Sequence, residues 1–145
     1  MVVKTFRGLL ADGGQDQIHL GTIKGKMGYR INKFQIMTEE PYGGGSGEHI
    51  VQIWKAEQTT IDANVNFTDG NLLGAAITNN STSGYNYGSL STIIFDNEIF
   101  NQDIFITHHD NQAGQSCNYY FELEAIPLTD QGAEYTTLKD IRTQS

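Results

Sequence analysis

The stretch from residue 104 to residue 126, which reads IFITHHDNQAGQSCNYYFELEAI, most constrains what this chain can fold into. In its second half Tyr119, Phe121 and Leu123 alternate with residues of more polar character, and this period of two predicts a half-buried strand. Residues 104–107 are β-branched and aromatic, which predicts a second strand. The polar segment between them, built of Asp, Asn, Gln and Gly, predicts a hairpin loop.

Short apolar runs separated by Gly, Asn and Asp turns continue through the rest of the chain. The apolar phase changes at Asn32 and Lys33, which predicts either a β-bulge or a strand that switches from one sheet to the other. Residues 49–55 are apolar on both faces, as in a central strand covered on two sides. We expect about nine strands, over residues 2–10, 17–23, 29–37, 49–55, 61–67, 72–77, 90–95, 104–107 and 118–126. The expected core residues are Trp54, Phe67, Tyr119, Phe121 and Leu123.

These strands predict an all-β fold, an antiparallel two-sheet β-sandwich over residues 1–132, and their number favours a jelly roll. Residues 133–145 lack strand character and predict a C-terminal arm or a short helix. Residues 2–10 are a first strand or a second terminal arm. Such arms can bind a neighbouring subunit, and the alternative that residues 133–145 pack on their own domain stays open. The anchors of the arm would be Tyr135, Leu138 and Ile141, which recur at a spacing of three.

Charge and hydropathy exclude two classes of partner. The chain of 145 residues has a net charge of −8. A charge of this sign repels phosphate backbones, so we expect no nucleic-acid partner. No apolar segment approaches the ~18 residues of a membrane span, and the N-terminus lacks the apolar run of a signal peptide. We therefore expect a protein that is made in a cytoplasm and has no membrane partner.

Two groups of residues are candidates for a metal or redox site. Cys117 is the single cysteine, so no intrachain disulfide can form, and an inert packed thiol is the expectation. His108, His109 and Asp110 form the most metal-like cluster, but adjacent histidines in a strand point to opposite faces. At most one of them can therefore join Asp110, and His49 or His19 can reach such a site only through tertiary structure. We expect no metal and no cofactor.

No motif predicts catalysis. Glu122 and Glu124 share one strand face at about 7 Å, between the spacings of retaining and inverting glycosidases. Exposed strands often carry such pairs, however, and no aromatic-rich cleft accompanies this one. We therefore expect no catalytic residues and no enzyme activity. Tyrosines in Gly-, Ser- and Asn-rich loops are typical both of adaptable binding surfaces for a glycan or receptor and of ordinary subunit contacts. The loop tyrosines are Tyr42, Tyr85 and Tyr87.

Three segments resemble small β-rich proteins encoded by tailed bacteriophages of aquatic environments: residues 92–107, residues 118–124 and residues 135–142. The Asp-Gly-Gly-Gln-Asp segment at residues 12–16 is similar as well. The resemblance implies a virion structural protein of the head or the tail, made in the host cytoplasm, and carries no functional residue. We therefore expect a non-enzymatic capsid protein (decoration or minor capsid) or tail component that assembles with itself and with other virion proteins. The alternative is a carbohydrate- or receptor-binding β-sandwich module.

Overall fold

The computed structural model describes residues 2–20, 27–41, 47–80 and 90–128. Within these ranges the chain forms eight strands and no helix. The expected arm at residues 133–145, with Tyr135, Leu138 and Ile141, and the loop tyrosines Tyr42, Tyr85 and Tyr87 lie outside the described residues. The strands are β1 (Val2–Leu10), β2 (Gln15–Ile18), β3 (Met27–Thr38), β4 (Gly47–Trp54), β5 (Leu72–Asn80), β6 (Leu90–Ile94), β7 (Ile104–Asp110) and β8 (Cys117–Pro127).

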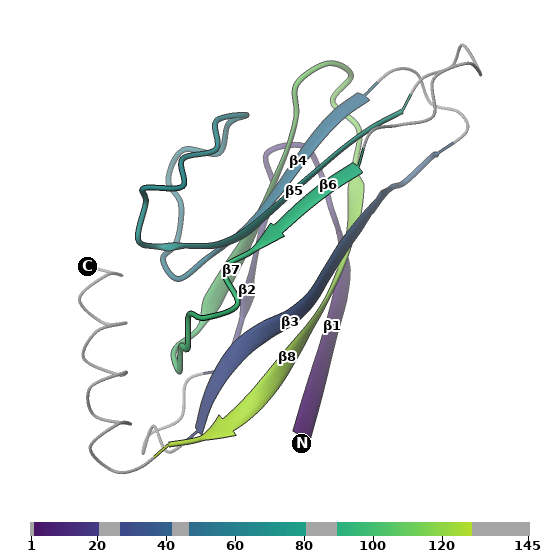
Figure 1. The fold of residues 1–145 in the computed structure, drawn as a ribbon. Coiled ribbons are helices and arrows are strands. Elements are labelled where there is room, and N and C mark those ends of the chain that lie inside the picture. Colours follow the sequence, from purple (N-terminus) through teal and green to yellow (C-terminus); the bar gives the residue numbers. More distant parts are fainter. Residues whose placement is uncertain (1, 21–26, 42–46, 81–89, 129–145) are drawn as a thin grey trace.

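The strands form two antiparallel sheets that pack face to face, so the all-β sandwich is confirmed (Figure 1). One sheet has the order β1-β8-β3 and the other has the order β2-β7-β4-β5-β6. An eight-stranded jelly roll nests its strands so that β1 pairs with β8, β2 with β7, β3 with β6 and β4 with β5. Here β6 pairs with β5 instead of β3, while the other three pairs are present. The jelly roll is therefore not confirmed.

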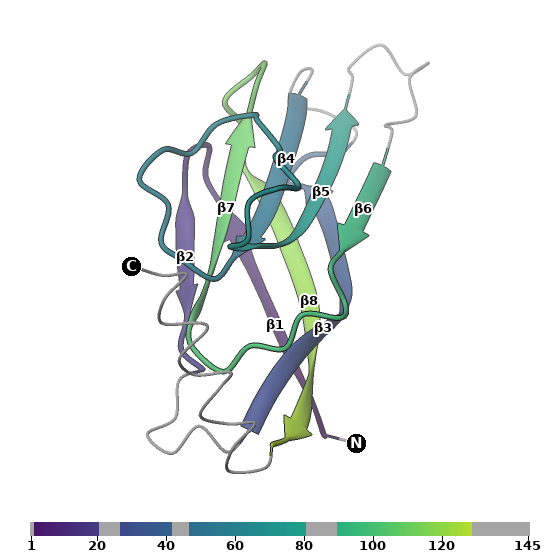
Figure 2. The ribbon, with the colours of Figure 1, turned by 60° about the vertical axis from the view of Figure 1, so that its left-hand side comes forward.

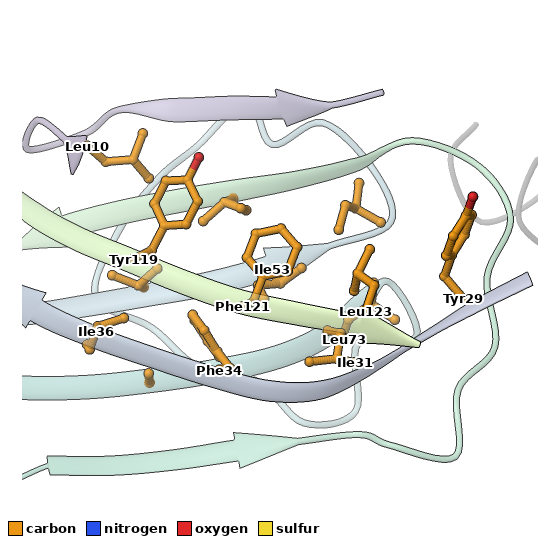
Figure 3. Packing of buried hydrophobic residues seen from close by; sticks show 14 of the residues in the cluster. Leu10, Tyr29, Ile31, Phe34, Ile36, Ile53, Leu73, Tyr119, Phe121 and Leu123 are labelled. Atoms are coloured by element: carbon orange, nitrogen blue, oxygen red, sulfur yellow. The ribbon is translucent and has the colours of Figure 1, made fainter. Parts of the chain in front are cut away.

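The core lies between the sheets and is lined by the alternating residues that the sequence singled out. Phe6, Phe121 and Phe34 stand side by side across β1, β8 and β3, and the ring centroids of Phe6 and Phe121 are 5.2 Å apart. Phe34 and Phe121 point toward the inner face of the larger sheet, where Ile53 lies (Figure 3). Ile53 and Val51 are completely buried on that face. Such aromatic rows bury a large apolar area per residue. The burial expected for Tyr119, Phe121 and Leu123 is confirmed.

Two detailed expectations for the strands are confirmed. The β3–β8 register shifts between Ile31 and Lys33, so Asn32 is the extra residue of a bulge, and Ile31 and Phe34 both face the core. Strand β4 is central, and its outer face is covered by residues 55–71 (Figure 2). Trp54 is buried on that outer face, where its indole N–H donates to Thr107 Oγ1 at 2.9 Å.

The expected hairpin between residues 104 and 126 is wrong. Strands β7 and β8 belong to different sheets, and the loop between them crosses from one sheet to the other. Asp110 holds this crossing, because its carboxylate accepts hydrogen bonds from the backbone N–H groups of Gln112, Ala113 and Gln115 at 2.8–3.2 Å. Those N–H groups are therefore turned toward a side chain and away from a neighbouring strand.

The expected strand over residues 61–67 is also wrong. Asp and Asn side chains there accept hydrogen bonds from backbone N–H groups two residues further on: Asn64 N–H donates to Asp62 Oδ1, and Thr68 N–H donates to Asn66 Oδ1. These local bonds replace the ladder that a strand would need. Phe67 is 56% exposed and packs edge-on against Phe95, so its expected place in the core is wrong.

Candidate functional site

Four chemically active side chains meet between the two sheets. His49 comes from β4, His108 and Asp110 come from β7, and Cys117 opens β8. His108 and Asp110 share a face because they are two residues apart in a strand, and His49 lies opposite Asp110 in the β4–β7 register. Crossing to the other sheet after β7 brings the thiol of Cys117 over the same patch. All four residues are buried.

The two imidazoles are in direct contact. His49 Nδ1 and His108 Nε2 are 2.9 Å apart, and the ring centroids are 5.1 Å apart with planes at 14°, so the two rings lie edge to edge and nearly coplanar. His108 Nδ1 lies 3.0 Å from the carbonyl oxygen of Ala11. A carbonyl can only accept, so the proton of neutral His108 belongs on Nδ1 and the lone pair on Nε2. One ligand atom from each of His49, His108 and Cys117 lies within 4.8 Å of the other two.

Burial sets the protonation of this cluster. Desolvation lowers the pKa of His108 below its usual value, so the ring is neutral near pH 7. Burial raises the pKa of the Cys117 thiol to about 12, and the sulfur lies 3.6 Å from the carbonyl oxygen of Met37. Desolvation also acts to raise the pKa of Asp110, but backbone N–H donors from Gln112, Gln115, Glu48 and Ala113 outweigh it and lower that pKa to about 2.

Sequence reasoning found part of this cluster. Because side chains alternate between the two faces of a strand, His108 and Asp110 share one face of β7 and His109 lies on the other. His109 is half-buried there, with Nδ1 3.5 Å from Asp12 Oδ1. His49 joins through strand pairing, whereas His19 lies elsewhere, 3.2 Å from Asp103. Cys117 was not expected to join, because nothing in the sequence predicts that β8 pairs in the other sheet. The expected packed thiol is nevertheless compatible with its burial.

A separate polar pocket of about 190 Å³ lies under residues 55–71, on the outer face of the larger sheet. Gln52 forms part of its wall and donates from Nε2 to the carbonyl oxygen of Asn64 at 3.1 Å. The Oε1 atom of Gln52 is buried and has no hydrogen-bond partner among the described residues. An amide oxygen of this kind can accept a bond from a hydroxyl or a water. The wall residues also include Trp54, Gln58, Asn66 and Thr107.

The paired carboxylates Glu122 and Glu124 lie on the outer face of the smaller sheet, not in a cleft. Arg30 donates to Glu124 Oε2, with the closest nitrogen at 2.7 Å, and Tyr120 Oη donates to Glu122 Oε1 at 2.7 Å. Each carboxylate is thus engaged by a neighbouring side chain on an open sheet surface. This arrangement lacks the enclosed pair of facing carboxylates that glycoside hydrolysis requires.

Strand β1 forms one edge of the smaller sheet, and no described residue pairs with its other side. Its apolar side chains Val2, Val3 and Leu9 are all exposed. The register with β8 runs without a shift from Val2 to Leu10. The backbone therefore presents a long regular row of N–H and C=O groups, which is a template for pairing with another strand.

No family model matches the chain, and a search of the curated proteins finds no match. Within the ranges that the structure describes, no helix is long and apolar enough to cross a membrane.

Proposed function

We propose that this chain is a non-enzymatic virion structural protein, a capsid or tail component that acts by assembling with other subunits. The observation that supports this most is the open edge of β1, a strand of nine residues with exposed Val2, Val3 and Leu9. Monomeric sandwiches usually block such an edge with a proline, a bulge, a short strand or charged side chains. Strand β1 contains no proline, and its register with β8 has no shift. Its two charged residues are Arg7 and Lys4, and the Lys4 ammonium donates to Tyr29 Oη at 3.3 Å.

An edge of this kind suits assembly because a neighbouring strand adds main-chain hydrogen bonds along its whole length. Two copies joined edge to edge would form an isologous contact, and a strand from another virion protein would form a heterologous one. Both arrangements place the exposed apolar side chains of β1 against the partner. The proposal covers a position in the capsid or in the tail, because both need the same kind of contact.

The test compares the mass of the full chain with that of an edge variant by size-exclusion chromatography with light scattering. The double variant Val3→Lys and Leu9→Lys places charges on exposed positions of β1, a device that protects natural edges. We expect the parent chain to form oligomers and the double variant to be monomeric. Met37→Lys is the matched control, since Met37 is also exposed but lies on β3, away from the β1 edge.

The outcome that contradicts the proposal is a parent chain that stays monomeric and does not co-sediment with phage particles. Equal loss of assembly in Met37→Lys would place the contact on the outer face of the smaller sheet instead of the β1 edge. Circular dichroism of each variant checks that the sheets are intact.

A second candidate function is recognition of a small polyhydroxylated ligand such as a glycan. The specific observation in its favour is the pocket under residues 55–71, where Gln52 Oε1 is a buried acceptor among amides and hydroxyls. Pockets that bind small molecules use a few such polar groups to fix orientation. On a glycan array we expect the parent chain to bind and Gln52→Leu to lose binding. Asn118→Ala, on the other sheet, should bind as the parent does, and an array without signal would remove this candidate.

A further inference from the structure

We propose that His49, His108 and Cys117 form an interior site for one transition-metal ion of the zinc class, which ties the two sheets together. The inference is independent of the proposed assembly role, because the cluster lies in the core and the β1 edge lies at the periphery. Two imidazole nitrogens and one sulfur are donors that zinc prefers. They come from β4, β7 and β8, so an ion held by them would bridge both layers of the sandwich.

Behind each of the two facing nitrogens, the other nitrogen of the same ring lies near an oxygen of the kind that orients metal-bound histidines. Metal-bound histidines almost always donate their second N–H to a carbonyl or carboxylate, which fixes the ring and its tautomer. His108 Nδ1 has the carbonyl oxygen of Ala11 at 3.0 Å, which is a hydrogen-bond distance. His49 Nε2 has the carboxylate of Asp110 at 3.9 Å, so this pair is close but must shorten to form a hydrogen bond. The opposite ring atoms, His49 Nδ1 and His108 Nε2, are the ones that face each other.

Asp110 is itself held in place. Its carboxylate accepts backbone N–H groups from Glu48, Gln112, Ala113 and Gln115 at distances of 2.8–3.2 Å. The carboxylate charge of Asp110 beside His49 is therefore stabilised by the loop that crosses between the sheets and by Glu48 in β4. A fixed anion at the back of a ligating imidazole favours the tautomer with its proton on Nε2, which leaves Nδ1 available to a metal.

The distances need only small adjustments. Zinc bond lengths of about 2.0 Å to nitrogen and 2.3 Å to sulfur place two nitrogens of a tetrahedral site about 3.3 Å apart, and a nitrogen and the sulfur about 3.5 Å apart. The two nitrogens, now at 2.9 Å, would separate by about 0.4 Å. The Cys117 sulfur lies within 4.8 Å of one ring nitrogen of each histidine, so reaching a distance of about 3.5 Å from these nitrogens requires a shift of at most about 1.3 Å.

Metal binding rearranges the protons of the cluster and releases one of them. Without metal, His49 Nδ1–H donates to the lone pair of His108 Nε2. On binding, the His49 proton moves to Nε2 beside Asp110, and the two facing nitrogens each give a lone pair to the ion. The Cys117 thiol loses its proton to solvent and binds as a thiolate, so one proton leaves for each ion bound. No oxidant or reductant takes part.

Burial makes this a structural site. The exposed fraction is 1% for His49 and zero for His108 and Cys117, so an ion reaches them only before the sheets close or through transient opening. Metal bound in this way stabilises the folded chain because the unfolded chain lacks the assembled site. The expected signature is a requirement for metal during folding and slow exchange afterwards.

The test refolds the full chain from denaturant with Zn²⁺ or with a chelator, and then removes free metal by gel filtration. We expect one zinc per chain by elemental mass spectrometry. In a separate melt with free zinc kept at one hundred times the dissociation constant, we expect the midpoint of thermal unfolding to rise by roughly 10 °C. Refolding with Co²⁺ should give a thiolate charge-transfer band in the near ultraviolet.

The variants Cys117→Ser and His49→Asn should lose the bound zinc, and Cys117→Ser should lose the charge-transfer band. His109→Asn is the matched control, because His109 is adjacent in β7 but faces away from the cluster. It should keep one zinc per chain. The proposal is overturned if the parent chain refolds equally well without metal and retains none, in which case the histidines form a hydrogen-bonded polar core only. It is overturned as well if His109→Asn or His19→Asn is the change that abolishes zinc binding. If Cys117→Ser or His49→Asn fails to fold, the zinc content and refolding of the parent chain still test the proposal.

Discussion

At the scale of single residues, a few buried polar groups determine how the chain passes between the two sheets. Asp110 terminates β7 and holds the following turn through backbone N–H donors. Tyr119 Oη donates to Asp16 Oδ2 at 2.7 Å and so joins β8 to β2 across the core. Burying such groups is costly unless each finds a partner, and here each one does. Asp110 therefore stabilises the crossing from β7 to β8, and Tyr119 stabilises the contact between β8 and β2.

We expect Asp110→Asn to lower the free energy of unfolding by about 1–3 kcal/mol, because an amide cannot accept all the backbone N–H groups that the carboxylate accepts. Urea unfolding in the presence of a chelator measures the change without any contribution from metal. Asp62→Asn is the control, since Asp62 accepts similar local bonds in an exposed turn. Its effect should stay within about 0.5 kcal/mol. Equal effects of the two changes would contradict the role given to Asp110.

Gly8 is required by its neighbour across the strand pair. A Cβ at Gly8 would lie 2.7 Å from Tyr119 Oη and 2.8 Å from two of its ring carbons. Tyr119 cannot move aside without breaking its bond to Asp16. We expect Gly8→Ala to destabilise by about 1–3 kcal/mol in urea unfolding. Gly70→Ala, where a Cβ would meet nothing within 4 Å, should be close to neutral, and a neutral Gly8→Ala would show that the ring is not fixed.

At the scale of elements, alternation in the sequence identifies strands and their buried faces but not their partners. The pattern around Tyr119, Phe121 and Leu123 predicted β8 and its inner face correctly. It could not show that β8 pairs with β1 and β3 and not with β7, because partner choice depends on contacts between distant residues. For the same reason, the sequence alone does not predict that Cys117 lies beside His49, His108 and Asp110.

Residues 61–67 show a second limit. Their apolar spacing of two is that of a strand, but Asp62, Asn64 and Asn66 occupy the alternate positions and bond to nearby backbone. Such side chains offer the backbone a local alternative to a ladder. Weighing Asx-turn chemistry against alternation would have corrected this element, and with it the misplaced Phe67.

The bulge in β3 gives a prediction at this scale. Asn32 is the extra residue opposite β8, so deleting it leaves Ile31 and Phe34 on the core face of a regular strand. We expect this deletion to cost about 1–2 kcal/mol, mainly through altered twist. Deleting Gln35 should cost more than about 4 kcal/mol, because it turns either Phe34 or Ile36 away from the core. Urea unfolding compares the two variants, and equal losses would argue against the bulge.

At the scale of the whole molecule, strands from opposite ends of the described chain pair with each other. The first strand pairs with the last described one, so that Val2 lies opposite Ala125. Contacts of such sequence separation are slow to form, since a long loop must close before they stabilise anything. We expect refolding on the millisecond-to-second timescale, measured by stopped-flow circular dichroism. Refolding within microseconds would be incompatible with this order of assembly.

The position of Trp54 has a practical consequence. It is the single tryptophan of the chain and is buried beneath residues 55–71, outside the apolar interior shared by the sheets. Its fluorescence emission therefore reports the environment under that cover. Detachment of the cover alone would shift the emission to longer wavelength while the far-ultraviolet signal of the strands stays constant. Two optical probes that disagree during denaturation would thus reveal a local opening, without any engineered label.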